Sequence, residues 1–111
     1  MRVAAVTSDL MLFSRIESAA TAAGASLVRV DSPADLPSAA DLDLVLVDWS
    51  ARRPRWADAL ARAATSEVRI ILFGQHTDLE AHGAARTAGL GPMWARSKLI
   101  TEMSSLLGGD S

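Results

Sequence analysis

The residues best suited to chemistry in this sequence are two carboxylates and an arginine that each follow an apolar run. Asp48 directly follows the apolar stretch 44–47, and Asp9 comes shortly after the stretch 3–6. Arg96 follows a later, shorter segment of the same kind. A carboxylate at the end of a buried strand can be a reactive group, a metal ligand or a cap for nearby backbone N–H groups. An arginine at the end of another strand could instead form an ion pair with that carboxylate.

The sequence does not contain the residue patterns of several other kinds of catalytic site. There are no cysteines, which excludes a disulfide framework, a thiolate metal site and a cysteine nucleophile. His76 and His82 are six residues apart, so they would not lie on the same face of a helix, and they are not expected to bind a zinc ion together. No serine sits on a glycine-flanked elbow, and no glycine-rich phosphate loop is present. We therefore expect no intrinsic enzyme activity.

Composition indicates one globular domain over residues 1–111. Half of the residues are apolar, which favours a packed core over disorder. The net charge of −2 gives no general attraction to nucleic acid or to an anionic membrane. No apolar run approaches the ~20 residues that span a bilayer. We expect a cytoplasmic protein with neither nucleic acid nor membrane as partner.

Apolar periodicity alternates between strand and helix along the chain. Strands are expected over residues 3–6, 27–30, 44–47, 68–73 and 93–95. Helices are expected from Ser8 or Asp9 to Gly24, from Pro54, from Thr77 to about Gly89, and from Ser97 onward. Between residues 33 and 41 Pro37 leaves at most a short or irregular helix. This alternation predicts an α/β, flavodoxin-like three-layer fold with a five-stranded parallel sheet in the order 2-1-3-4-5.

Three stretches of the sequence carry a family resemblance. "DLDLVLVD" (41–48), "VRIILFGQHTD" (68–78) and "AGLGPMWARSKL" (88–99) resemble the third strand, the fourth strand with its loop, and the fifth-strand segment of response-regulator receiver (CheY-like) domains. With five strand–helix units in order, the resemblance covers essentially the whole chain. It implies that Asp48 stands at the phosphoacceptor position, which a histidine kinase phosphorylates in working receivers.

The other receiver positions depart from the family pattern. The resemblance places Ser8 and Asp9 at the acidic pair, Gly74 at the switch hydroxyl and Arg96 at the lysine. The strand-five aromatic becomes a methionine. Asp9 and Asp48 could hold Mg²⁺ only weakly, so no firm cofactor is expected. These departures predict an atypical receiver, or pseudo-receiver.

A pseudo-receiver would act through its surface. We expect a stand-alone domain that works by protein–protein contact or self-association in two-component-type signalling, through the face formed by the fourth helix, fifth strand and fifth helix. Candidate interface residues are Trp49, Met93, Trp94, Leu99 and Met103.

Two alternatives remain open. One is a working receiver phosphorylated on Asp48 by a histidine kinase. The other is a small α/β anion-binding protein or enzyme that uses Asp9, Asp48 and the arginines. The basic cluster Arg52, Arg53 and Arg55 is either a solvated loop or a contact for an anion or acidic partner.

Overall fold

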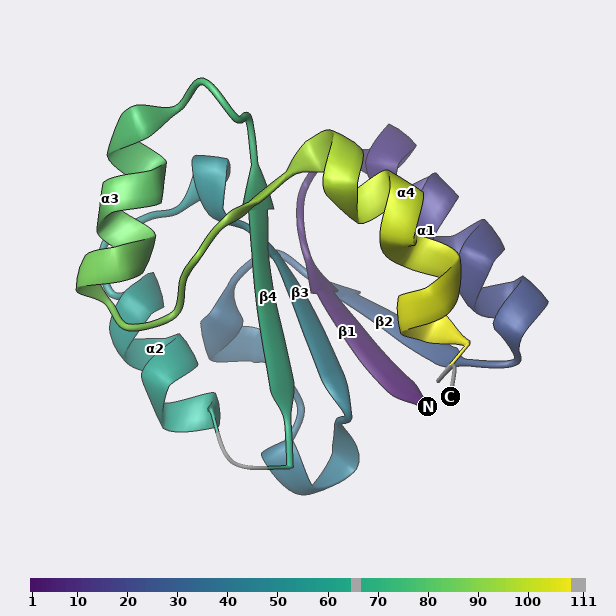
Figure 1. Ribbon diagram of the computed structural model, residues 1–111. Helices are drawn as coiled ribbons and strands as arrows, with labels where there is room; N and C mark the ends of the chain where they lie inside the picture. The colour runs from purple at the N-terminus through teal and green to yellow at the C-terminus, as the bar shows by residue number, and fades with distance from the viewer. Residues whose placement is uncertain (65–66, 109–111) are drawn as a thin grey trace.

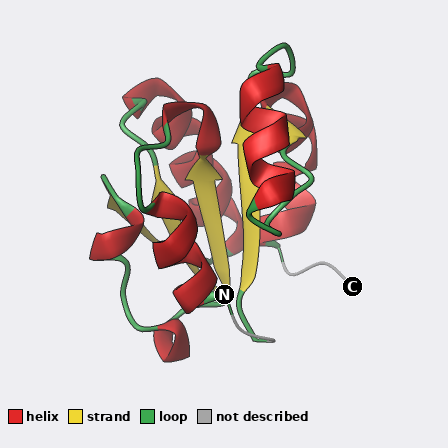
Figure 2. Ribbon diagram, turned by 90° about the vertical axis from the view of Figure 1, so that its left-hand side faces the viewer, coloured by secondary structure: helices red, strands yellow, loops and turns green. Residues whose placement is uncertain are grey.

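Five parallel strands form one sheet in the computed structural model, which describes residues 1–64 and 67–108. The strands are β1 (Arg2–Val6), β2 (Ser26–Val30), β3 (Leu44–Asp48), β4 (Arg69–Gly74) and β5 (Trp94–Ala95). Their order is β2-β1-β3-β4-β5, which confirms the predicted topology. The arrowheads point in one direction, so all carboxyl ends meet at one edge of the sheet (Figure 2).

Helices cover both faces of this sheet. They are α1 (Leu10–Ala23), α2 (Trp56–Ala63), α3 (Leu79–Thr87) and α4 (Arg96–Leu107). Figure 1 shows α1 and α4 on one face and α2 and α3 on the other. The segment after β2 forms only two 3₁₀ turns, Pro33–Asp35 and Ala39–Asp41, as its prolines predicted. In the described parts of the chain, no helix combines the length and apolar character needed to cross a membrane.

The ends of α1 follow the predicted rules. The backbone N–H of Leu12 donates to Asp9 Oδ1 at 3.1 Å, so Asp9 is the N-cap. Gly24 ends the helix with φ of 72°, a left-handed conformation that glycine adopts without steric cost.

The starts of the other helices differ from the sequence prediction by one or two residues. Asp78, and not Thr77, caps α3 by accepting from the backbone N–H of Ala81. α4 begins at Arg96 rather than after a Ser97 cap, which keeps the Arg96 side chain at the carboxyl edge of the sheet. α2 begins two residues after the predicted Pro54, because the preceding residue adopts a left-handed backbone.

The core consists of two apolar layers, one on each side of the sheet. Every residue of β3 is buried, as its unbroken apolar run predicted for a central parallel strand. Val45 and Val47 pack toward α2 and α3, whereas Leu44 and Leu46 pack toward α1 and α4. Trp56 also lies in the first layer. This alternation leaves the last residue of β3, Asp48, at the rim of the second layer.

Candidate functional site at the carboxyl edge of the sheet

Asp48 lies where β1, β3 and β4 end together. The register pairs Val6 with Val47 and Asp48 with Phe73, so residues just beyond each strand meet at one level. Asp48 is only 9% exposed. The sequence therefore placed this acid correctly at the edge where ligands of open α/β sheets bind.

Among the described residues, one side-chain hydrogen bond reaches Asp48, and it is long. The Thr7 hydroxyl donates a long hydrogen bond of 3.5 Å to Asp48 Oδ2. In the parts of the chain that the structure describes, neither Arg52 nor Arg96 forms an ion pair with it. Burial raises the pKa of Asp48, although the nearby Arg96 charge and the Thr7 hydroxyl act in the opposite direction. The protonated form is thus favoured more than for an exposed aspartate.

Arg96 is paired with Asp9 instead. Its Nη2 lies 2.6 Å from Asp9 Oδ2, joining residues that are 87 positions apart in the sequence. The other Asp9 oxygen accepts the capping hydrogen bond from Leu12. These two interactions lower the pKa of Asp9, with the Leu12 N–H as the larger cause. Asp9 is therefore an ionised cap held in place from both sides.

This arrangement does not suit a magnesium ion. Mg²⁺ requires several oxygen ligands in near-octahedral geometry. Both carboxylate oxygens of Asp9 already have partners, and Asp48 is buried with a raised pKa. No group of three or more potential metal-ligating side chains occurs within residues 1–64 and 67–108. We therefore derive no chemical step that depends on a metal.

Ser50 occupies the space beside Gly74, a feature that the sequence did not reveal. A Cβ at position 74 would lie less than 3.0 Å from Ser50 Oγ and 3.0 Å from Met93 Sδ. The same hydroxyl accepts a hydrogen bond of 3.1 Å from the backbone N–H of Gln75. The Ser50 hydroxyl, from the loop after β3, thus fills the space that a side chain at position 74 of β4 would occupy.

A cavity of about 170 Å³ lies next to these groups. It is lined by Asp48, Ser50, Ala51, Gly74, Gln75 and Arg96. Drug-sized ligands occupy roughly 300–1,000 Å³, so this space suits water or a small anion. Ser8, the remaining predicted site residue, is exposed and lines a different crevice.

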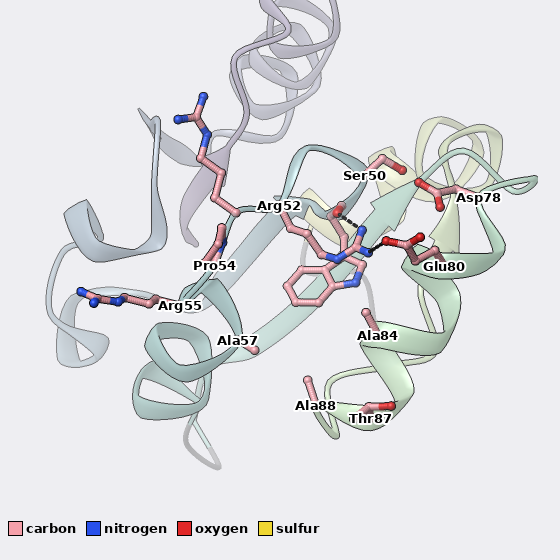
Figure 3. A pocket seen from close by; sticks show the side chains of 12 residues that line it. Ser50, Arg52, Pro54, Arg55, Ala57, Asp78, Glu80, Ala84, Thr87 and Ala88 are labelled. Atoms are coloured by element: carbon pink, nitrogen blue, oxygen red, sulfur yellow. Dashed lines mark hydrogen bonds and ion pairs between the residues drawn. The ribbon is translucent and has the colours of Figure 1, made fainter.

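Arg52 is held away from Asp48 by other partners. Its guanidinium donates to the Trp49 carbonyl at 3.3 Å and lies 3.5 Å from Glu80 Oε1. It also lies 5.6 Å from the centre of the Trp49 ring. Figure 3 shows Arg52 directed toward Glu80, across the hollow between the loop after β3 and α3.

The predicted interface is wrong for Trp49. Its side chain is only 2% exposed, and its indole N–H donates to the carbonyl of Ala81 at 3.0 Å. The loop after β3 turns the ring inward beneath α3 instead of leaving it at the surface.

Three further interface predictions are also wrong, for Met93, Leu99 and Met103. Each is buried, because the segment just before β5 directs Met93 into one core layer and α4 directs Leu99 and Met103 into the other. Only Trp94 remains partly exposed, with Lys98 Nζ 4.4 Å from its ring centre.

Comparison with known proteins identifies the fold. No protein-family model matches this sequence, and no curated protein matches it either. A response regulator receiver protein from Burkholderia phymatum superposes with a TM-score of 0.67 at 18% identity, covering 99% of this chain and 96% of that one. The fold is that of a receiver domain. The pilus assembly protein CpaE from Caulobacter crescentus shares the receiver fold with a TM-score of 0.59 at 16% identity, over 95% of this chain and 91% of that one.

Proposed function

We propose that this chain is an atypical receiver domain that signals by protein contact and does not use Asp48 as a regulated phosphoacceptor. The observation that carries the proposal is the state of Asp9, whose two carboxylate oxygens are both engaged, one by a backbone N–H and one by Arg96. The receiver fold supplies the context of two-component-type signalling. We further propose that the domain has no enzymatic activity of its own.

Phosphoryl transfer to Asp48 would require charge neutralisation that these residues supply poorly. The transferred group spreads negative charge over its oxygens, and metal ions and cationic side chains normally balance it. Among the described residues, Arg96 is the only arginine that lines the small cavity, and its charge is already paired with Asp9. Burial also disfavours the ionised form of Asp48, which is the nucleophilic form.

A phosphorylation signal would also need a side chain that responds to it. Gly74 has none, and the adjacent Ser50 hydroxyl accepts a hydrogen bond from the backbone N–H of Gln75, which ties it to the present conformation of the loop. Met93 is buried and packed against this point. These contacts support a single conformation, in which the protein surface carries the function.

The proposed contact surface runs over α3, β5 and α4. Trp94 is its aromatic centre, with Lys98 Nζ 4.4 Å and the Arg69 guanidinium 5.9 Å from the ring centre. Partly exposed tryptophans flanked by cations are frequent anchors in protein interfaces. The partner would be another protein or a second copy of this chain.

Labelling with acetyl phosphate tests the proposal. The protein is incubated with acetyl phosphate and Mg²⁺, and intact-mass spectrometry measures phosphoryl addition, with Asp48→Asn as the matched control. We expect no addition that depends on Asp48. Stoichiometric labelling that is lost in Asp48→Asn would establish instead a working receiver in which Arg96 takes the place of the family's lysine.

The contact surface is tested separately by sedimentation. Self-association of the wild type that is lost in Trp94→Ala, and retained in Met11→Ala, would support the surface. Equal behaviour of the two variants would remove Trp94 from it. Met11 serves as control because it is an exposed apolar residue on α1, outside the proposed surface.

A further inference from the structure

A second crevice, larger than the one beside Asp48, opens at the point where the strand order reverses. It measures about 740 Å³ and is bounded by the ends of β1 and β2, the loop after β3, and α2. Its lining residues include Ser8, Ser32, Arg53, Pro54, Arg55 and Arg62. Open α/β sheets bind ligands at this topological position. The crevice shares only Ala51 with the cavity beside Asp48.

The crevice carries a concentrated positive charge. Arg53, Arg55 and Arg62 are all exposed, and none forms an ion pair with another residue in the two described segments. Asp31, the one acid among the described lining residues, forms an ion pair with Arg29 at 2.6 Å. Three unpaired guanidinium groups therefore gather around one crevice, although the whole chain has a net charge of −2.

Backbone geometry holds one of these arginines in an unfavourable conformation. Arg55 has φ of 77°, and it is the one non-glycine residue with positive φ in the described parts of the chain. A side chain with a Cβ rarely adopts this region, and such residues concentrate at functional sites. Figure 3 shows the Arg55 side chain extending away from Arg52 and Glu80. The turn thus separates Arg52, which is paired, from Arg55, which is free.

Hydroxyl groups and small apolar side chains complete the lining. Ser8 and Ser32 stand at the ends of β1 and β2. The Ser32 oxygen accepts from the backbone N–H of Ala34 at 3.2 Å, which leaves its proton available to donate. Pro54 and Ala59 provide apolar surface.

We propose that this crevice binds a small organic molecule that carries two or more phosphate groups. Guanidinium forks match phosphate oxygens, and three such groups require a ligand with several negative charges. The volume lies in the range of small-molecule sites, and three arginines are too few for a nucleic-acid surface. Ligand binding here goes beyond the proposed contact function and does not depend on the state of Asp48.

Calorimetric titration tests this site with two probes, ATP and inorganic tripolyphosphate. The variants are Arg53→Gln and Arg62→Gln, and the control is Arg15→Gln, an exposed arginine on α1 at the other face of the sheet. We expect saturable binding of both probes by the wild type. Each site variant should weaken it roughly tenfold, because a hydrogen bond to a charged group contributes about one such factor. Arg15→Gln should bind like the wild type.

Arg55→Gly separates binding from folding. Glycine accepts the left-handed backbone, so this variant should raise Tm while it weakens ATP binding. Higher stability combined with lower affinity is the result expected only if the strained arginine serves a ligand.

Three results would overturn the proposal. The first is no saturable binding of either probe at millimolar concentration. The second is equal weakening by Arg15→Gln and Arg53→Gln, which would reveal general charge attraction. The third is tighter binding of a single-stranded oligonucleotide than of ATP, with the same dependence on Arg53, Arg55 and Arg62, which would indicate a nucleic-acid surface.

Discussion

Substitution of Gly74 by alanine should destabilise the fold, because the space that the methyl group needs is already filled. The new Cβ would overlap Ser50 Oγ and approach Met93 Sδ to 3.0 Å. Forcing a methyl group into packed surroundings costs about 1–3 kcal/mol. If Ser50 rotates away, the hydrogen bond from Gln75 is lost, at about 0.5–1.5 kcal/mol.

One effect opposes this loss. Replacing glycine by alanine within a strand restricts the unfolded chain and gains about 0.5–1 kcal/mol. The net expectation for Gly74→Ala is therefore a loss of about 0–2.5 kcal/mol in the free energy of unfolding, with about 1 kcal/mol at the middle of that range. For a domain of this size, a loss of about 1 kcal/mol corresponds to a decrease in Tm of roughly 4–8 °C.

A double-mutant cycle with Ser50→Ala isolates the cause. Removing the hydroxyl should relieve the closest overlap, although Ser50 Cβ would still lie 3.2 Å from the new methyl group. Urea unfolding of the wild type, both single variants and the double variant should therefore give a favourable coupling of about 0.5–2 kcal/mol. Gly83→Ala is the matched control, because no atom beyond the neighbouring residues and the local helix backbone lies within 4 Å of its added Cβ and helix α3 should gain stability. Additive single effects, or destabilisation by Gly83→Ala as large as that by Gly74→Ala, would refute the reasoning.

Three further predictions concern the residues around Asp48. Burial raises the pKa of Asp48, so the folded state loses stability as Asp48 ionises with rising pH. Asp48→Asn should therefore raise Tm at pH 7–8, and thermal melts should show that this gain in Tm shrinks as pH falls. Arg96→Gln should lower Tm at pH 7, because it removes the ion pair with Asp9. The difference in Tm between the variant and the wild type should narrow in high salt, and also at low pH as Asp9 is protonated through its lowered pKa. A Tm difference that does not change with salt would argue against the ion pair. Trp49→Phe removes the hydrogen bond from the indole N–H to the Ala81 carbonyl, which still lies within the hydrogen-bonded helix α3. The loss should cost about 0.5–1.5 kcal/mol in the free energy of unfolding measured in urea, whereas an unchanged midpoint would mean that the bond contributes nothing.

Local sequence patterns predicted the fold because each strand–helix unit carries its own signals. The unbroken apolar run of β3 indicates burial on both faces, and Asp48 at its end follows directly from the chain order. Asp9 and Gly24 mark the ends of α1 through interactions with residues three or four positions away. The strand order does not follow from these local signals alone. It was predicted because right-handed connections leave few arrangements of five strand–helix units, of which the flavodoxin-like order is a common one.

The environment of Asp48 was decided only by tertiary structure. Arg96 contacts Asp9 across 87 residues, and no sequence rule distinguishes that pairing from one with Asp48. Ser50 fills the place beside Gly74 because two loops converge there, and Trp49 is buried because α3 supplies a carbonyl for its indole N–H. The sequence by itself determined which residues reach the carboxyl edge of the sheet. Which of them touch depends on side-chain directions and on packing between distant segments, and these interactions form only when the whole chain is folded.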